Sequence, residues 1–162
     1  MALRVTDVQG VKVYLAPKGS DVSTIENVET AIASAKQVDC LQALGSIAAT
    51  RATVDYSCMS SDEVAFSLGS VTYSDQSIEV LFDSQDTAGK KDLMDAWENK
   101  ERRQLIIALN DKPNENAGSS PTYITYEIGI SGQEIALEKD GAVRVTSTCK
   151  PTKPKLFRAV AA

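Results

Sequence analysis

The feature that most constrains this chain is the alternation of apolar and polar residues along its clearest segments. Between residues 122 and 131, apolar side chains occupy every second position: Ile124, Tyr126, Ile128 and Ile130. Successive side chains of a β-strand point to opposite sides of its sheet, so this period predicts a strand with one buried face. Residues 71–83 repeat the pattern, with Ile78, Val80 and Phe82 on one face and Ser77, Glu79, Leu81 and Asp83 on the other. The chain is therefore expected to fold around a sheet.

Shorter runs and turn signals predict the remaining strands. They are expected at residues 11–15, 38–41, 50–56, 105–109, 134–137 and 142–149. Asp140-Gly141 lies between the last two, and Asp-Gly is a strong hairpin signal. In residues 20–36, Ile25, Val28 and Ile32 have near-helical spacing, and this segment is compatible with either a short helix or a plain loop.

One helix is predicted from Lys90 to Arg103. Leu93, Met94 and Trp97 share one of its faces and are expected to be buried against the sheet. Residues 83–87 offer helix N-caps, and the basic residues at its end, Lys100, Arg102 and Arg103, suit the negative end of a helix dipole.

Residues 57–70 are dominated by small polar side chains and predict a long loop or a loosely ordered hairpin. Its apolar residues are Met59, Val64, Phe66 and Leu68, and Asp62-Glu63 are its acidic pair. Residues 1–10 and 150–162 are expected to be terminal arms, the second one basic through Lys153, Lys155 and Arg158. Together these segments predict a single domain over residues 1–162. It is mainly β, a sandwich or small barrel with one flanking helix.

Composition restricts the chemistry of the chain. It contains no histidine, which removes the commonest general base and metal ligand near neutral pH. Its formal charge of −5 disfavours wrapping nucleic acid, because phosphate binding needs a basic surface. The cysteines are Cys40, Cys58 and Cys149, an odd number at long spacings that indicates neither a disulfide framework nor a zinc site.

No motif for catalysis or cofactor binding is present in the sequence. Asp62 and Glu63 are adjacent carboxylates, but they are expected at a solvated loop tip. No apolar stretch has the length of a signal-peptide core or of a membrane span. The sequence therefore predicts a protein that is not an enzyme, with no catalytic residues, no metal, no cofactor and no membrane partner.

An ordered set of short segments runs from residue 38 to about residue 109. It comprises Cys40-Leu41-Gln42-Ala43-Leu44-Gly45-Ser46-Ile47, Thr50-Arg51-Ala52-Thr53-Val54-Asp55-Tyr56, Ser61-Asp62-Glu63, Gly69, Ser77-Ile78-Glu79-Val80-Leu81-Phe82-Asp83, Asp86 and the helix with Leu93 and Trp97. This order resembles the major tail tube proteins of long-tailed, siphovirus-like bacteriophages. Residues 20–36 and 110–121 match nothing in that family, and the extra immunoglobulin-like domain that some members carry is not expected here.

The resemblance implies a structural role in a virion tail. Six such subunits form a ring, their sheets join into one barrel around a channel, and the rings stack into a tube. DNA and a tape-measure protein pass through that channel, and tail tip and tail terminator proteins are further implied partners. The resemblance also implies assembly in the host cytoplasm and a role in genome ejection.

Particular residues follow from this implied assembly. The long loop, with Met59, Asp62, Glu63, Val64, Phe66 and Leu68, is expected to contact the next ring. The basic arm is expected to contact an acidic neighbour. If the polar strand faces line the channel, the lumen-facing residues are Glu79, Glu127, Ser77, Tyr123 and Thr125, and they form a negative wall that repels DNA.

Three other classes of protein remain open at this point. One is the tube subunit of a contractile tail or a secretion machine. Another is a monomeric binding module or virion-decorating protein, which would form no tubes. The third is a histidine-free enzyme, which a pocket or metal would support.

Overall fold

The computed structural model describes residues 10–57, 59–60, 62–82, 89–137, 139 and 141–162. The predicted N-terminal arm, the predicted helix caps at residues 83–87, and Cys58 lie outside these residues, apart from Gly10. The elements follow one another as β1 Lys12–Pro17, α1 Ile25–Ser34, β2 Lys36–Gln37, β3 Leu41–Leu44, β4 Ala49–Ser57, β5 Val64–Tyr73, β6 Gln76–Leu81, α2 Gly89–Glu98, β7 Arg102–Ala108, β8 Tyr123–Ala136, β9 Arg144–Pro151 and β10 Lys155–Phe157.

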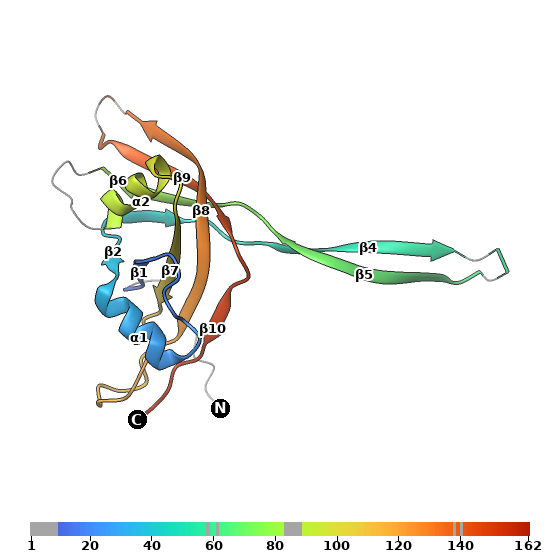
Figure 1. The fold of residues 1–162 in the computed structure, drawn as a ribbon, viewed down its shortest axis with the longest axis horizontal. Coiled ribbons are helices and arrows are strands. Elements are labelled where there is room, and N and C mark those ends of the chain that lie inside the picture. Colours follow the sequence, from blue (N-terminus) through green and yellow to red (C-terminus); the bar gives the residue numbers. More distant parts are fainter. Residues whose placement is uncertain (1–9, 58, 61, 83–88, 138, 140) are drawn as a thin grey trace.

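One antiparallel sheet forms the body of the molecule (Figure 1). Its strand order is β2-β1-β7-β8-β9-β6-β3, and β10 pairs with the start of β8. The long strand β8 changes partners along its length: residues 123–129 pair with β7, and residues from Ile128 onward pair with β9. A register shift between Ile130 and Gly132 marks a bulge, which bends β8 where it leaves β7.

The curved sheet encloses the main core together with helix α2. Leu15, Ile78, Leu105 and Ile128 project from four strands into this core, and Leu93 enters it from α2. The alternation of the sequence is confirmed here for Ile78, Val80, Tyr126 and Ile128, which are buried. Phe82, predicted on the same face as Ile78 and Val80, lies beyond the end of β6 and is exposed. The predicted mainly β fold with a flanking helix is therefore confirmed.

Helix α1 covers the opposite face of part of the sheet and resolves the ambiguity of residues 20–36. Thr24 caps it by accepting a hydrogen bond from the backbone N–H of Asn27 at 3.2 Å. Val28 and Ala31 of α1 pack against Tyr123 and other residues of a second core cluster. The sheet is therefore covered on both faces along β1, β7 and the start of β8.

Of the two alternatives predicted for residues 57–70, a long loop or a loosely ordered hairpin, the structure shows the hairpin. Strands β4 and β5 pair from Ala49↔Tyr73 to Ser57↔Val64 and form a separate two-stranded sheet. This hairpin projects far from the body (Figure 1). Val64, Phe66 and Leu68 alternate with small residues, as a strand requires, and the apolar side chains are exposed, not packed on the body.

Several boundaries also differ from the sequence predictions. Residues 71–83 do not form one strand, because Ser74 and Asp75 separate β5 from β6. Helix α2 ends at Glu98, so Arg102 and Arg103 belong to β7 and not to the last helical turn. The predicted C-terminal arm begins inside β9 and contains β10, which is hydrogen-bonded to β8.

Candidate functional site

The projecting β4–β5 hairpin carries six of the twelve large apolar side chains that are exposed among the described residues. On one face β5 carries Val64, Phe66 and Leu68, which are 65%, 66% and 61% exposed. The pairs Asp55↔Phe66 and Thr53↔Leu68 place short polar side chains of β4 beside them. An apolar stripe of this kind, on a strand that meets only its hairpin partner, indicates a surface that another chain covers.

The second face of the hairpin is also apolar, although its apolar residues come from the other strand. Val54 and Tyr56 of β4 lie opposite Ser67 and Ala65 of β5 and are themselves exposed. A two-stranded hairpin is marginally stable in water when neither face is covered. Both faces of this hairpin therefore have apolar surface for a neighbour to bury.

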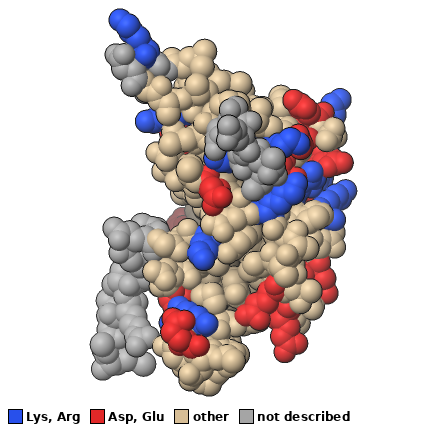
Figure 2. All heavy atoms as spheres, turned by 90° about the vertical axis from the view of Figure 1, so that its left-hand side faces the viewer, with Lys and Arg blue, Asp and Glu red and all other residues tan. Residues whose placement is uncertain are grey.

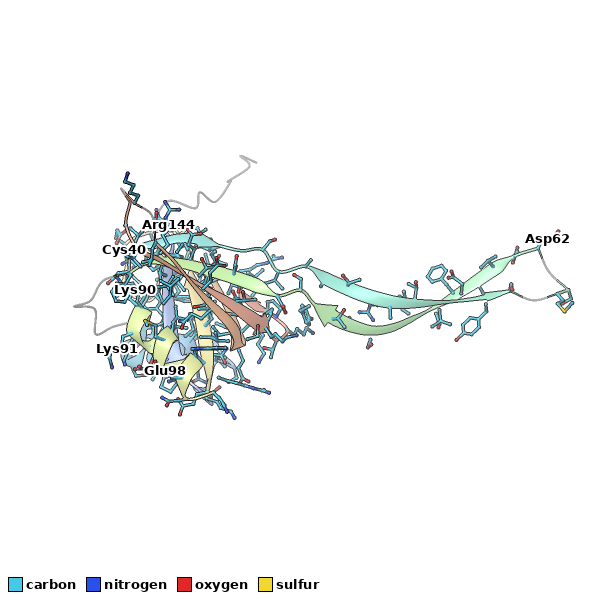
Figure 3. All side chains as sticks on the ribbon, turned by 90° about the horizontal axis from the view of Figure 1, so that it is seen from above. Cys40, Asp62, Lys90, Lys91, Glu98 and Arg144 are labelled. Carbon is cyan, nitrogen blue, oxygen red and sulfur yellow. The ribbon has the colours of Figure 1, made fainter. Side chains whose placement is uncertain are left out.

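The far end of the hairpin is acidic. Figure 3 places Asp62 at the tip, remote from Cys40, Lys90, Lys91, Glu98 and Arg144 on the body. Glu63 follows Asp62 at the tip, and Asp55 lies on β4; all three residues are exposed. Met59 is fully exposed at the same end. The residues expected to contact a neighbouring ring thus lie together on this projection, although as a hairpin and not as a loop.

Two of the strand edges that lack a partner among the described residues lie at the ends of the series β8-β9-β6-β3; β2 and β10 each have one further unpaired edge. Strand β3 pairs with β6 on one side only, and residues 131–136 of β8 pair with β9 on one side only. Unpaired edges expose rows of backbone N–H and C=O groups, which favour pairing with another chain. The strands β8, β9, β6 and β3 are each antiparallel to the next, so β3 runs antiparallel to β8.

Trp97 lies near the unpaired edge of β8 and is not buried as predicted. Its exposed fraction is 39%, whereas Leu93 is 1% exposed and Met94 is half-buried. Trp97, Gly129 and Ile130 help to line an open groove of about 470 Å³. The face of α2 that packs inward is formed instead by Gly89, Leu93 and Ala96, and Trp97 remains available to a partner.

A polar face of the sheet is left open beside the two helices. Glu79 of β6 pairs with Thr146 of β9, and Thr146 pairs with Glu134 of β8, so the three side chains share one face. Ser77 and Thr148 form the neighbouring row. Neither of the two described helices packs on these rows. Their side chains are mostly hydroxyl groups, and the charged ones are the two glutamates.

The candidate lumen residues do not all lie on this open face. Ser77 is exposed, and Glu79 and Glu127 are partly exposed. Tyr123 and Thr125 are buried, because α1 and the side chain of Phe157 cover this face of the first half of β8. Their assignment as lumen-facing in the folded subunit is therefore wrong.

Both candidate lumen glutamates form ion pairs. Glu79 accepts from Arg144 Nη1 at 3.2 Å, and Glu127 accepts from Arg102 Nη1 at 3.0 Å. Each pair is partly exposed and solvent-screened, so it contributes little to stability. Their consequence is electrostatic, because an adjacent arginine offsets the negative charge of each glutamate. The expected wall is therefore less negative than the sequence indicated.

The C-terminal segment is bound to the body of the subunit. Ser120 and Val160 form a backbone bridge, and the N–H of Ala159 donates to Thr122 Oγ1 at 3.0 Å. Phe157 packs against the core cluster beneath α1. The basic side chains of Lys153, Lys155 and Arg158 are exposed on this segment. Their predicted contact with an acidic neighbour stays a prediction.

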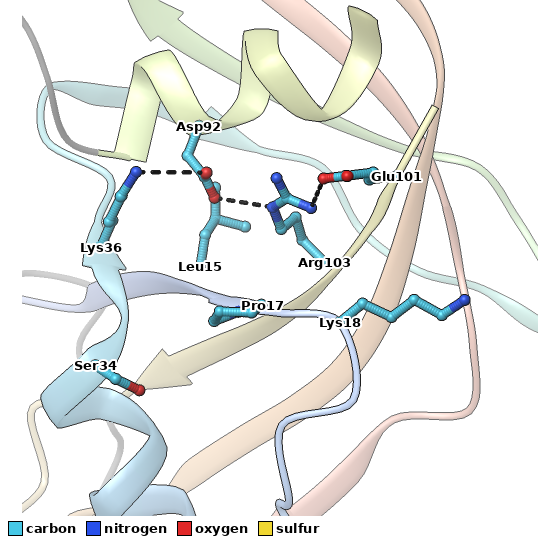
Figure 4. Close-up of a pocket in the computed structure, with 8 residues that line it drawn as sticks. All are labelled: Leu15, Pro17, Lys18, Ser34, Lys36, Asp92, Glu101 and Arg103. Atoms are coloured by element: carbon cyan, nitrogen blue, oxygen red, sulfur yellow. Dashed lines mark hydrogen bonds and ion pairs between the residues drawn. The ribbon is translucent and has the colours of Figure 1, made fainter. Parts of the chain in front are cut away.

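An ion-pair cluster lines a cavity of about 400 Å³ between β1, α1 and α2 (Figure 4). Arg103 donates from Nε to Asp92 at 3.1 Å and from Nη1 to Glu101 at 2.7 Å, and Lys36 lies 3.7 Å from Asp92. Partial burial disfavours the charged guanidinium, but the hydrogen bonds to Glu101 and Asp92 raise the pKa of Arg103. Both carboxylates form ion pairs with basic side chains. Because Asp92 is on α2 and Arg103 is on β7, the cluster joins α2 to the sheet.

The buried cysteine of the core is held in its protonated form. Burial raises the pKa of the Cys149 thiol to about 12, which leaves it protonated and weakly nucleophilic. Among the described residues, no group of three His, Cys, Asp or Glu side chains is placed to hold a metal ion. In the same part of the chain, no helix has the length and apolarity needed to cross a membrane.

The charged side chains on the helical side of the body are of both signs. Figure 2 shows basic and acidic residues interspersed on this face, several of them side by side. A single-sign field of the kind that attracts nucleic acid is not seen on this side.

Comparison with solved structures identifies the fold of this chain. A chain of the SPP1 tail tube superimposes with a TM-score of 0.68 at 15% identity, over 96% of this chain and 81% of that one. A chain from the tail of an empty gene transfer agent (GTA) particle, refined with C6 symmetry, gives 0.62 at 14% identity, over 96% and 100%. The sheath-tube complex of the extracellular contractile injection system PVC gives 0.66 at 10% identity, over 96% and 93%. No protein-family model and no curated protein sequence matches the chain. At these identities the likeness shows that this chain has the tail tube fold.

Proposed function

We propose that this chain is the structural subunit of a bacteriophage tail tube, in which rings of six subunits stack around a channel for DNA. The observation that carries the proposal is the hairpin β4–β5, whose two apolar faces are exposed on a chain with the tail tube fold. An isolated subunit gains nothing from such a projection, whereas a stacked ring covers it. The C6 symmetry of the structurally similar GTA tail supports rings of six.

Ring closure follows from the two unpaired strand edges. Strand β3 of one subunit pairs with residues 131–136 of β8 in the next, and the antiparallel alternation of β8, β9, β6 and β3 continues across the joint. The contact is head-to-tail, so its repetition generates a closed ring in which the β3 and β8 edges are both paired. Trp97 lies beside this edge and is covered when the neighbour is in place.

Ring stacking uses the hairpin and the C-terminal segment. Val64, Phe66 and Leu68 are buried by the adjacent ring, while Met59, Asp62 and Glu63 contact it at the tip. The basic side chains of the segment, Lys153, Lys155 and Arg158, contact acidic surface of a neighbour. Exposed ion pairs of this kind contribute at most about 1 kcal/mol each and weaken with salt.

The open polar face, with Ser77, Glu79 and the partly exposed Glu127, lines the channel. Hydroxyl-rich rows and glutamates offset by arginines give DNA no cluster of cations to bind, so it slides past. In this role the protein is not an enzyme and needs no cofactor. It belongs to the tail of a long-tailed, siphovirus-like virion, is assembled in the host cytoplasm, and works with tape-measure, tail tip and tail terminator proteins during genome ejection.

Electron microscopy of the purified chain tests the proposal. Concentrated protein is expected to form tubes or six-fold rings, and a variant in which residues 52–70 are replaced by a short glycine-serine turn is expected to stay folded and form no stacked tubes. A chain that remains monomeric at high concentration, with or without the hairpin, would contradict the proposal and favour a monomeric binding module.

A second candidate is the tube of a contractile machine, favoured by the likeness to the PVC sheath-tube complex. The two candidates differ in whether the outer wall of the tube binds a sheath. Co-assembly of the purified tubes with sheath protein encoded in the same genome separates them. Tubes that recruit such a sheath would overturn the assignment to a non-contractile tail.

A further inference from the structure

We propose that Gln76 and Tyr126 form a buried polar latch that fixes the direction in which the β4–β5 hairpin leaves the body. Its importance for assembly rests on the proposed function, in which the hairpin is the stacking element. Its effect on the hairpin itself is a property of the single subunit. The latch connects the centre of the core to both chain segments at the root of the hairpin.

The latch is a continuous chain of hydrogen bonds. The phenol of Tyr126 donates to Gln76 Oε1 at 2.6 Å, and Gln76 Nε2 donates to the carbonyl of Gly45 at 2.8 Å. Tyr126 and Gln76 are 2% and 3% exposed, so the bonds are shielded from water. Gln76 occupies an inward position in register with Ile78 and Val80, where the alternation of the strand calls for an apolar residue. A polar side chain at this position is retained for what it binds.

The residues that the latch holds are the root of the hairpin. Gly45 precedes β4, and its N–H donates to the carbonyl of Ser77 at 2.7 Å. A side chain at Gly45 would lie 2.7 Å from Ser77 Oγ and 2.9 Å from Ser77 N, so only glycine allows this approach. Farther out, Ser74 and Ala48 exchange two bonds of 2.8 Å that close the root.

Beyond this root, the hairpin has few other supports. Its strands pair with each other, and their side chains are exposed over nearly all of their length. Strand β5 alone contains 10 residues, so at about 3.3 Å per residue the hairpin reaches about 30 Å from the root. A rotation of about 10° at the root displaces such a tip by about 5 Å, which exceeds the length of a hydrogen bond. A hairpin that must meet a neighbour therefore needs a fixed root.

Double electron–electron resonance on the soluble subunit measures the direction of the hairpin. One spin label is attached to the exposed Cys40 on the body and the other to a cysteine introduced by Thr53→Cys on β4, in a Cys58→Ser background. Cys149 stays unlabelled because it is buried. The parent protein is expected to give one narrow distance distribution. Tyr126→Phe, which removes only the phenolic oxygen, and Gln76→Leu are each expected to broaden it at least two-fold.

Ile107→Val is the matched control, because it loosens the same core without touching the latch. This variant is expected to keep the narrow distance distribution of the parent, although its melting temperature falls about as much as that of Tyr126→Phe. If Gln76→Leu fails to fold, Tyr126→Phe still decides the question. Equal widths in Tyr126→Phe and the parent, or a broad distribution in the parent itself, would overturn the latch.

Tube yield separates the latch from the proposed function. If the parent forms tubes and a broadened Tyr126→Phe subunit forms fewer, both proposals are supported. If the parent forms no tubes, the proposed function fails, while the distance measurement still decides the latch. Broadening in Tyr126→Phe that leaves tube yield at the parent level would overturn the claim that stacking depends on the latch.

Discussion

Phe66 offers the sharpest test of the hairpin as an assembly surface. Its ring is 66% exposed in the subunit and lies in the stripe that the adjacent ring is proposed to cover. Replacing it with serine removes apolar surface that contributes to assembly and hardly to folding. We therefore expect Phe66→Ser to raise the protein concentration needed for tube formation while the melting temperature stays within about 2 °C of the parent, since exposed substitutions change stability little.

The magnitude follows from the exposed fraction. Burying a whole phenylalanine side chain contributes about 1.5–3 kcal/mol. Since about two thirds of this side chain is still exposed, its covering contributes about 1–2 kcal/mol per subunit, which is a factor of roughly 5–30 in an equilibrium constant. The critical concentration, measured by light scattering and by pelleting of tubes, is expected to rise by this factor. The triple variant with Val64→Ser and Leu68→Ser added is expected to form no tubes in the same concentration range.

Phe66→Leu is the matched control, because it keeps most of the apolar surface at the same position. It is expected to assemble within about three-fold of the parent, since apolar swaps of similar size cost little. A Phe66→Ser protein that polymerises at the parental concentration would refute the stacking role of this face. A large fall in melting temperature would instead show that the hairpin folds back onto its own body.

Further predictions concern the helix, the channel and the core. Leu93→Ala is expected to cost about 2–5 kcal/mol of folding stability by thermal denaturation, whereas Trp97→Ala is expected to cost less than the roughly 3–5 kcal/mol of a fully buried ring and to impair ring formation instead. Glu79→Lys combined with Glu127→Lys is expected to leave tubes that assemble, less efficiently, in virions that eject DNA slowly; normal ejection kinetics from well-formed tails would contradict the channel assignment. Because burial raises the pKa of Cys149 to about 12, its thiol is expected to remain protonated at pH 8 and to react with a thiol reagent only when urea unfolds the chain; fast reaction in the native protein would contradict that burial.

The sheet was predictable wherever one face of a strand is buried and the other is not. Ile78 and Val80 face the core as the period of two required, and so do Tyr126 and Ile128. The same rule fails at Tyr123 and Thr125, because α1 and the side chain of Phe157 cover the face that a half-buried strand would leave open. Nothing in the alternation of a single strand reveals which stretch of it a distant helix covers.

The hairpin was predicted only as one of two alternatives, and the buried helix face was predicted wrongly, for different reasons. In residues 57–70 the alternation of Val64, Phe66 and Leu68 was present, but the strand has no buried face to give it contrast. In α2 the large apolar residues suggested one face, whereas the helix packs through Leu93 and small residues. A side chain on Gly89 would lie 2.6 Å from the carbonyl oxygen of Gln37. The face of α2 with small residues therefore turns inward, because only that face lets the helix backbone approach the chain at Gln37. The spacing of hydrophobic residues along the sequence does not predict such a close contact between a helix and a neighbouring backbone.

The four strands β8, β9, β6 and β3, which end at the edges proposed to join subunits, have a consequence for the size of the proposed ring. Because their number is even, every joint between identical subunits is antiparallel, and the hydrogen bonds would be equally well made in a ring of five, six or seven. Strand pairing alone thus sets no stoichiometry. The subunit count must come from the angle through which twist and the bulge near Ile130 turn each four-strand segment. Substitutions at that bulge would then alter the diameter of the bore without breaking the tube.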